Sequence, residues 1–132
     1  MNGELKAVLI ADDDEDILAL VDRALSESGY EVLLARDGVR ALAMVREQKP
    51  ALALLDVSMP GLDGYEVTSA VKNDPATKDT IVILFTARSE ASDVEKGYDA
   101  GADDYIMKPF TLKTLQSRVA VALGRATEVA QS

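Results

Sequence analysis

The chain has 132 residues, 48% of them hydrophobic and 28% charged, which is typical of one globular domain with its own core. It contains no cysteine and no histidine, so disulfides, thiolate metal sites and histidine general-base chemistry are excluded. Fourteen basic against 23 acidic residues give a net charge of −9, which argues against a nucleic-acid surface on this domain.

The first ten residues, MNGELKAVLI, lack the basic start and the apolar core of a signal peptide. No later apolar run approaches the length of a membrane span. We therefore expect a cytoplasmic protein that has no membrane partner.

Five short apolar runs predict β-strands, and segments of helical period lie between them. The runs are continuous, as expected of parallel strands that are buried on both faces. This alternation predicts an α/β fold, a doubly wound sheet with right-handed crossovers, in one domain over residues 1–126 with a frayed tail at 127–132. The predicted strands are Ala7–Ala11, Glu31–Leu34, Ala51–Asp56, Ile81–Phe85 and Tyr105–Met107.

The segments between the strands predict amphipathic helices. Asp63 with Glu66, and Ser92 with Glu95, have the spacing of a capping box at a helix start. In the first helix we expect one buried face, formed by Ile17, Leu20, Val21, Ala24 and Leu25.

Five acidic residues follow the first strand directly. The dipole of the next helix accounts for Asp14, Glu15 and Asp16, because acids are favoured in a first turn. It does not account for Asp12 and Asp13, which repel each other at the strand end. A hard cation such as Mg²⁺ would relieve that repulsion, but this run alone leaves both interpretations open.

Asp56 follows the wholly apolar third strand. It could act as a cap, but the Pro60-Gly61 turn comes later and does not need it. The carboxyl ends of parallel strands meet at one edge of the sheet, so Asp56 should lie beside Asp12 and Asp13. Three carboxylates there predict a metal site.

Polar residues also follow the fourth and fifth strands. Thr86 could satisfy backbone donors or donate a hydrogen bond to a phosphoryl oxygen. Lys108 could be a solvated charge or a point-charge partner of phosphate. The Lys108–Pro109 bond is a candidate cis peptide. Together with the acids, these residues suit phosphoryl transfer, which depends on positioning and charge neutralisation.

From about Ala7 to Arg125 the chain resembles the receiver domain of two-component response regulators. The resemblance implies a flavodoxin-like fold, a five-stranded parallel sheet of order 2-1-3-4-5 with helices on both faces. It also implies a phosphoacceptor that promotes only its own phosphorylation and dephosphorylation and is not otherwise an enzyme. The resemblance is based on four motifs in order: Asp12-Asp13, LLDVSMPGLDGYEV with Asp56, FTARSE with Thr86, and GADDYIMKPF with Lys108 and Pro109.

The resemblance assigns Asp56 as the residue that takes a phosphoryl group from a sensor histidine kinase or a histidine phosphotransfer protein. It implies a Mg²⁺ or Mn²⁺ ion bound by Asp13, Asp56 and the backbone carbonyl of Ser58, with Asp12 acting largely through water. It also suggests that Ser58 and Arg88 tune dephosphorylation.

The resemblance further assigns Thr86, Ala87, Tyr105 and Lys108 to phosphoryl binding and switching. Lys108 would pair with the phosphoryl group. On phosphorylation Thr86 would move toward the phosphoryl oxygens, and the ring of Tyr105 would turn inward behind it.

The switched surface should be the fourth helix, fifth strand and fifth helix, roughly residues 89–125, acting on a downstream target protein or a fused output domain. A phosphorylation-dependent homodimer is a further option. The chain has Val94 and Thr114 where one dimerising subfamily has a basic and an acidic residue, so that dimer is doubtful. Three other charges match that subfamily, namely Asp103, Asp104 and Arg118.

Three alternatives share parts of this pattern. A flavodoxin-like FMN electron carrier would need small residues after the first strand, where this chain has acids that repel phosphate. A haloacid-dehalogenase-type phosphatase would need an aspartate at the position of Ser58. A phosphorylation-independent pseudo-receiver would usually lack some of the acids that are present here.

Overall fold

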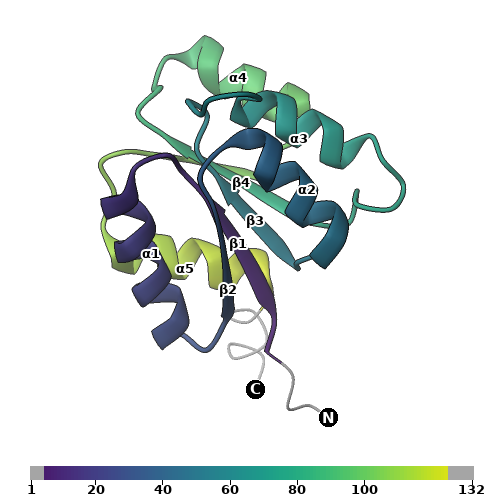
Figure 1. The fold of residues 1–132 in the computed structure, drawn as a ribbon. Coiled ribbons are helices and arrows are strands. Elements are labelled where there is room, and N and C mark those ends of the chain that lie inside the picture. The colour runs from purple at the N-terminus through teal and green to yellow at the C-terminus, as the bar shows by residue number, and fades with distance from the viewer. Residues whose placement is uncertain (1–4, 125–132) are drawn as a thin grey trace.

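A computed structural model describes residues 5–124 of the chain. Five parallel strands form one sheet of order β2-β1-β3-β4-β5, with helices on both faces (Figure 1). The predicted fold class and strand order are therefore confirmed. The expected frayed tail, residues 127–132, lies outside the described residues.

The strands agree with the predicted ones to within one residue at each end. The register pairs Ala11, the last residue of β1, with Ala35 of β2 and with Leu55 of β3. The residues that follow β1 and β3 therefore leave the sheet at the same level. The strands are β1 (Ala7–Ala11), β2 (Glu31–Ala35), β3 (Leu52–Leu55), β4 (Ile81–Thr86) and β5 (Asp104–Met107).

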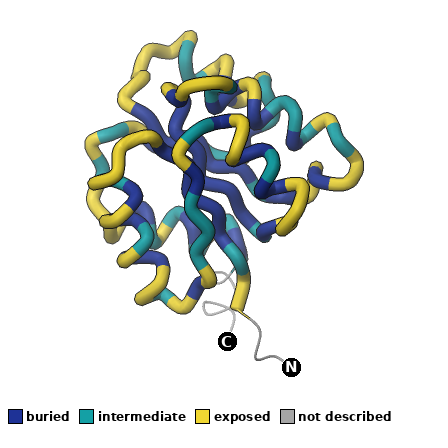
Figure 2. The backbone as a smooth tube through the Cα atoms, in the orientation of Figure 1, coloured by how far each residue is buried: buried dark blue, intermediate teal, exposed yellow. Residues whose placement is uncertain are grey.

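Each face of the sheet has its own apolar core. Helices α1 and α5 cover one face of the sheet, and α2, α3 and α4 cover the other (Figure 1). Their apolar side chains form one core cluster with each face. The three central strands β1, β3 and β4 are buried between these layers, the edge strands β2 and β5 are only partly buried, and the outer sides of the helices are exposed (Figure 2). The helices are α1 (Glu15–Glu27), α2 (Gly38–Gln48), α3 (Gly64–Lys72), α4 (Ala91–Ala100) and α5 (Leu112–Ala122).

Two helix predictions were wrong in detail. In α1, Leu18 is buried and Leu20 is 52% exposed, because the buried face follows Leu18, Val21 and Leu25. The α4 helix begins at Ala91, so Ser92 is already inside it and cannot cap it. The residue before the helix is Glu90, and its backbone amide donates to the Asp93 carboxylate at 3.3 Å.

The capping box at the start of α3 is confirmed. The Asp63 carboxylate accepts from the amide of Glu66 at 2.8 Å, and the Glu66 carboxylate accepts from the amide of Asp63 at 2.9 Å. Within residues 5–124, no helix has both the length and the apolar character needed to cross a membrane.

Candidate functional site

The ends of β1 and β3 bring three carboxylates together. The amide of Asp56 donates to the carbonyl of Ala11 at 2.9 Å, which extends the β1–β3 pairing by one residue. Carboxylate oxygens of Asp12, Asp13 and Asp56 lie within 4.8 Å of one another. The three acids that the sequence placed at one edge of the sheet thus form one cluster, and oxygen-only donors suit a hard divalent cation.

Lys108 extends from the end of β5 into this cluster. Its ammonium nitrogen lies 2.9 Å from Oδ2 of Asp12 and 3.6 Å from Oδ2 of Asp56. It also lies 4.9 Å from the centre of the Phe85 ring. The Lys108–Pro109 peptide bond is cis. The Lys108 ammonium group thus faces two of the three acids at the site.

The two inner acids are almost fully buried, with Asp12 1% and Asp56 6% exposed. Each carboxylate oxygen of Asp12 has a partner: Oδ2 contacts Lys108, and Oδ1 accepts from the amide of Asp14 at 2.9 Å. Asp56 accepts from backbone amides of the loop that follows it, with a long bond of 3.4 Å from the amide of Ser58. Burial, and then the charge of Asp12, raise the pKa of Asp56, while Lys108 and backbone donors oppose this in part. The Asp56 carboxylate therefore stands where added positive charge would be most favourable.

Two glycines set the position of the loop that follows Asp56. A Cβ on Gly64 would lie 2.5 Å from the carbonyl oxygen of Asp56, and the Gly64 amide donates to the carbonyl of Val57 at 2.9 Å. A Cβ on Gly38, at the start of α2, would overlap the backbone of Leu62. Sequence reasoning missed Gly38, whose single local signal was the Asp-Gly pair before a helix.

The end of β4 faces the same site. Thr86 is buried, and its hydroxyl accepts from the amide of Arg88 at 3.3 Å. The side chain of Arg88 donates from Nε to the hydroxyl of Ser58 at 3.3 Å, so it bridges the two loops. Ala87 is exposed beside them. The predicted dephosphorylation pair, Ser58 and Arg88, is thus in contact.

Tyr105 lies inward beneath α4 and is 6% exposed. Its hydroxyl donates to the carbonyl of Arg88 at 2.8 Å. The hydroxyl of Tyr65 lies 3.5 Å from that of Tyr105. Sequence reasoning missed Tyr65, since an aromatic residue in an amphipathic helix indicates only a core position.

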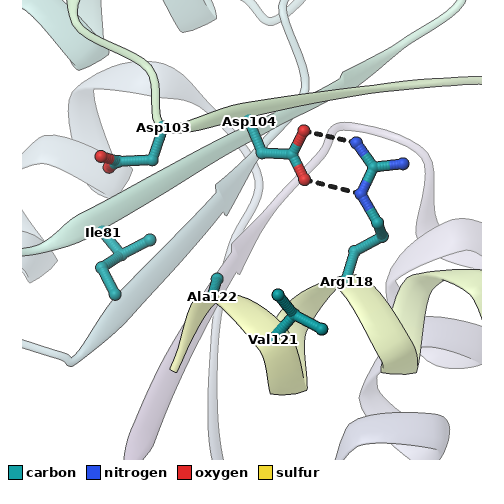
Figure 3. A pocket seen from close by; sticks show the side chains of 6 residues that line it. All are labelled: Ile81, Asp103, Asp104, Arg118, Val121 and Ala122. Carbon is teal, nitrogen blue, oxygen red and sulfur yellow. Dashed lines mark hydrogen bonds and ion pairs between the residues drawn. The ribbon is translucent and has the colours of Figure 1, made fainter. Parts of the chain in front are cut away.

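Two of the hollows on the surface of the described residues border residues that the sequence analysis singled out. One, beside Lys108, has a volume of about 410 Å³ and is mostly apolar, lined by Ile17, Leu20, Val21, Ala87, Lys108, Pro109, Phe110 and Leu112. The other has a volume of about 260 Å³ and is lined by Ile81, Asp103, Asp104, Arg118, Val121 and Ala122 (Figure 3).

Comparison with known proteins gives one family. The model described as the response regulator receiver domain matches residues 8–120. The transcriptional regulatory protein PrrA of Mycobacterium tuberculosis is 43% identical over 125 residues, which are 95% of this chain and 53% of PrrA. The chain spans about half the length of the curated relatives it matches.

Solved structures agree with this. The chemotaxis response regulator CheY4 of Vibrio cholerae has a TM-score of 0.85 and 30% identity, covering 90% of this chain and 99% of that chain. The structure described as the BeF3-activated DrrB receiver domain has a TM-score of 0.83 and 34% identity, covering 92% of this chain and 100% of that chain.

Proposed function

The chain belongs to the response regulator receiver family, and from this premise we propose how its residues carry out the phosphoacceptor function. The domain is a phosphoacceptor signalling module and not an enzyme that turns over a separate substrate. We propose that Asp56 is the acceptor and that the receiver domain extends over residues 1–126.

The proposed donor is a sensor histidine kinase or a histidine phosphotransfer protein. An oxygen of the Asp56 carboxylate attacks phosphorus, the phosphorus–nitrogen bond of the donor's phosphohistidine breaks, and the nitrogen keeps the electron pair. Lys108, 3.6 Å from Asp56, is placed to neutralise charge on the transferred group. Dephosphorylation is a separate step: water attacks phosphorus, the phosphorus–oxygen bond to Asp56 breaks, and inorganic phosphate is released as the Asp56 carboxylate leaves with the electron pair.

The acidic cluster fits a divalent cation, because three carboxylates with only one lysine leave an excess of negative charge. We propose that Asp13, Asp56 and the Ser58 carbonyl bind Mg²⁺, or Mn²⁺ in its place, with Asp12 acting largely through water. When bound, the ion would neutralise charge on the phosphoryl oxygens.

Thr86, Ala87 and Tyr105 are the proposed switch residues. The hydroxyl of Thr86 and the amide of Ala87 would donate to phosphoryl oxygens, while Tyr105 reports the change to α4. The acyl phosphate carries about −1.5 to −2 charges in place of the single charge of the Asp56 carboxylate, beside the two other acids of the cluster. The output surface would be α4, β5 and α5, which acts on a downstream target protein or a fused output domain.

All three of the charges that match the dimerising subfamily already have partners within the chain. Arg118 of α5 pairs with Asp104 of β5 (Figure 3). Asp103 pairs with Lys72 of α3 at 2.9 Å. A phosphorylation-dependent homodimer through these charges would have to exchange internal pairs for external ones, so we favour a partner protein or output domain.

The apolar hollow beside Lys108 supports a protein donor. It adjoins the lysine that contacts Asp56, and it exposes Leu20 and Leu112 to solvent. A donor that packs an apolar side chain there would be held next to the acceptor. The kinase and phosphotransfer protein present this same chemistry, a histidine-bound phosphoryl group.

The observation that carries the proposal is the position of the buried Asp56 carboxylate, which has Lys108 and two further acids around it. Incubation with acetyl phosphate and Mg²⁺, followed by intact-mass analysis, tests it. We expect one phosphoryl adduct on the wild type, none on Asp56→Ala, and none in chelator. The absence of an adduct on the wild type would favour a pseudo-receiver that acts through protein contacts alone.

A further inference from the structure

Two tyrosine hydroxyls meet beneath α4. Tyr65 lies in the first turn of α3 and is 4% exposed, and Tyr105 lies in β5. Their hydroxyl oxygens are 3.5 Å apart, although the two residues are 40 positions apart in the chain. A buried hydroxyl needs a hydrogen-bond partner, and each of these two has a different one.

The two hydroxyls hold opposite ends of one segment. Tyr105 donates to the carbonyl of Arg88 at 2.8 Å, and Tyr65 donates to the carbonyl of Asp93 at 3.1 Å. A tyrosine hydroxyl has one proton, so each donates to its own carbonyl. The stretch from Arg88 to Asp93, which joins β4 to the first turn of α4, is therefore fixed at both ends.

The α4 helix also rests on both rings. The ammonium group of Lys96 lies 4.8 Å from the centre of the Tyr65 ring. A Cβ on Gly97 would lie 2.9 Å from the Tyr105 ring, so the helix backbone packs directly on that ring. Burial, and then the contact with Tyr65, raise the pKa of Tyr105, which keeps its hydroxyl protonated as a donor.

Both ends of this arrangement connect to the acceptor. Tyr65 follows Gly64, which packs against the carbonyl of Asp56. Arg88, whose carbonyl Tyr105 holds, reaches the hydroxyl of Ser58 with its side chain. The loop after Asp56 thus contacts the start of α3, and α3 contacts α4 through Tyr65. The same loop also contacts the segment before α4, through the bond between Arg88 and Ser58.

We propose that Tyr65 is a positioning residue of the phosphorylation switch, which holds the Arg88–Asp93 segment together with Tyr105. This rests on the proposed function. If either hydroxyl loses its carbonyl, the other hydroxyl is within reach as an alternative partner. The pair therefore offers the segment two hydrogen-bonded arrangements, and phosphorylation of Asp56 selects between them.

The direction of the effect follows from the inward position of Tyr105. The Tyr65 contact supports the arrangement in which that ring is buried, the one expected of the phosphorylated state. Removing the Tyr65 hydroxyl should therefore weaken binding of a phosphoryl mimic by about threefold to tenfold, as expected of one lost neutral hydrogen bond.

A double-mutant cycle tests the proposal on the 132-residue chain. Tyr65→Phe, Tyr105→Phe and the double variant are titrated with beryllofluoride at saturating Mg²⁺ by calorimetry, and with Mg²⁺ alone. Tyr98→Phe is the matched control, because Tyr98 is an exposed tyrosine of α4. We expect Tyr65→Phe to weaken beryllofluoride binding and not Mg²⁺ binding, Tyr98→Phe to change neither, and the double variant to lose less than the product of the single losses.

Three outcomes would overturn it: beryllofluoride binding by Tyr65→Phe equal to that of the wild type, an equal weakening of Mg²⁺ binding, or single losses that multiply fully. Each leaves the proposed function intact if the wild type still accepts a phosphoryl group on Asp56. A wild type that neither binds beryllofluoride nor accepts a phosphoryl group would overturn both proposals together.

Discussion

The Asp56 carboxylate is the residue whose charge the surrounding fold opposes most clearly, since burial and Asp12 raise its pKa. Asparagine keeps the shape of the side chain and removes the charge. Because Lys108 still has Asp12 as a partner at 2.9 Å, we expect Asp56→Asn to raise the free energy of unfolding by on the order of 1 kcal/mol at pH 7 in chelator. Urea unfolding measures this.

The pH dependence of that difference has a definite sign. A carboxylate with a raised pKa destabilises the fold only when it is ionised, so the advantage of Asn should be smallest below the ordinary pKa of 3.8. It should grow as the pH rises through the folded-state pKa of Asp56. The control is Asp16→Asn, an exposed acid in the first turn of α1, which should give no gain. Equal stability of wild type and Asp56→Asn at pH 7 would contradict the prediction.

The side chain of Arg88 joins the loop after β4 to the loop after β3 through its bond to Ser58, and so covers the space beside Asp56. We expect Arg88→Ala to open a path for water and to speed decay of the phosphorylated form by roughly threefold, less than 1 kcal/mol of barrier. Intact-mass analysis after removal of acetyl phosphate follows the decay. Arg46→Ala, an exposed arginine in the last turn of α2, is the control, and a decay rate of Arg88→Ala equal to it would exclude this role.

At the scale of the elements, the start of α3 matters most, because its first residue packs against Asp56. Asp63→Ala removes the side chain that caps this helix, so we expect a loss of about 1 kcal/mol in the free energy of unfolding. Ser92→Ala is a matched control, since Ser92 lies inside α4 and does not cap it. Thermal and urea unfolding compare the two variants, and equal losses would show that the capping box contributes nothing measurable.

The strands could be predicted from the sequence because a parallel strand buried on both faces needs a continuous apolar run. The acidic cluster followed from the same logic, since the residues after β1 and β3 must meet. The buried side of α1 was harder to predict. Leu18 and Leu20 are equally apolar, and only the direction in which α1 packs on the sheet decides that Leu18 is buried.

The parts of the site that could not be predicted depend on contacts between distant segments. The Tyr65 hydroxyl binds the carbonyl of Asp93, 28 positions away, and no local pattern encodes that pairing. The role of Gly38 depends on how closely α2 approaches the backbone of Leu62. Such approaches are set by packing of whole elements, so they become visible only in the folded chain.

At the scale of the whole molecule, cation binding should be coupled to folding. At a Mg²⁺ concentration 100 times the Kd, a ligand that binds only the folded state stabilises it by about 2.7 kcal/mol. We expect Mg²⁺ to raise the unfolding midpoint of the wild type and to have little effect on Asp13→Asn, which lacks one carboxylate of the cluster. Differential scanning calorimetry in Mg²⁺ and in chelator measures this.

The control for this experiment is again Asp16→Asn, whose carboxylate lies outside the cluster. It should retain the full Mg²⁺ effect. An unfolding midpoint of Asp13→Asn that rises with Mg²⁺ as much as that of the wild type would contradict a cation site built on these three acids.

The place of β3 in the sheet has a consequence for hydrogen exchange. β3 lies between β1 and β4 and is fully buried, whereas β5 is an edge strand. Backbone amides of a central strand open to solvent mainly by global unfolding, while edges open in local fluctuations. The amides of β3, and that of Asp56 bonded to Ala11, should therefore be among the slowest to exchange, and those of β5 and α4 faster. Phosphorylation would then occur on the part of the chain that opens last and alter exchange in the parts that open first.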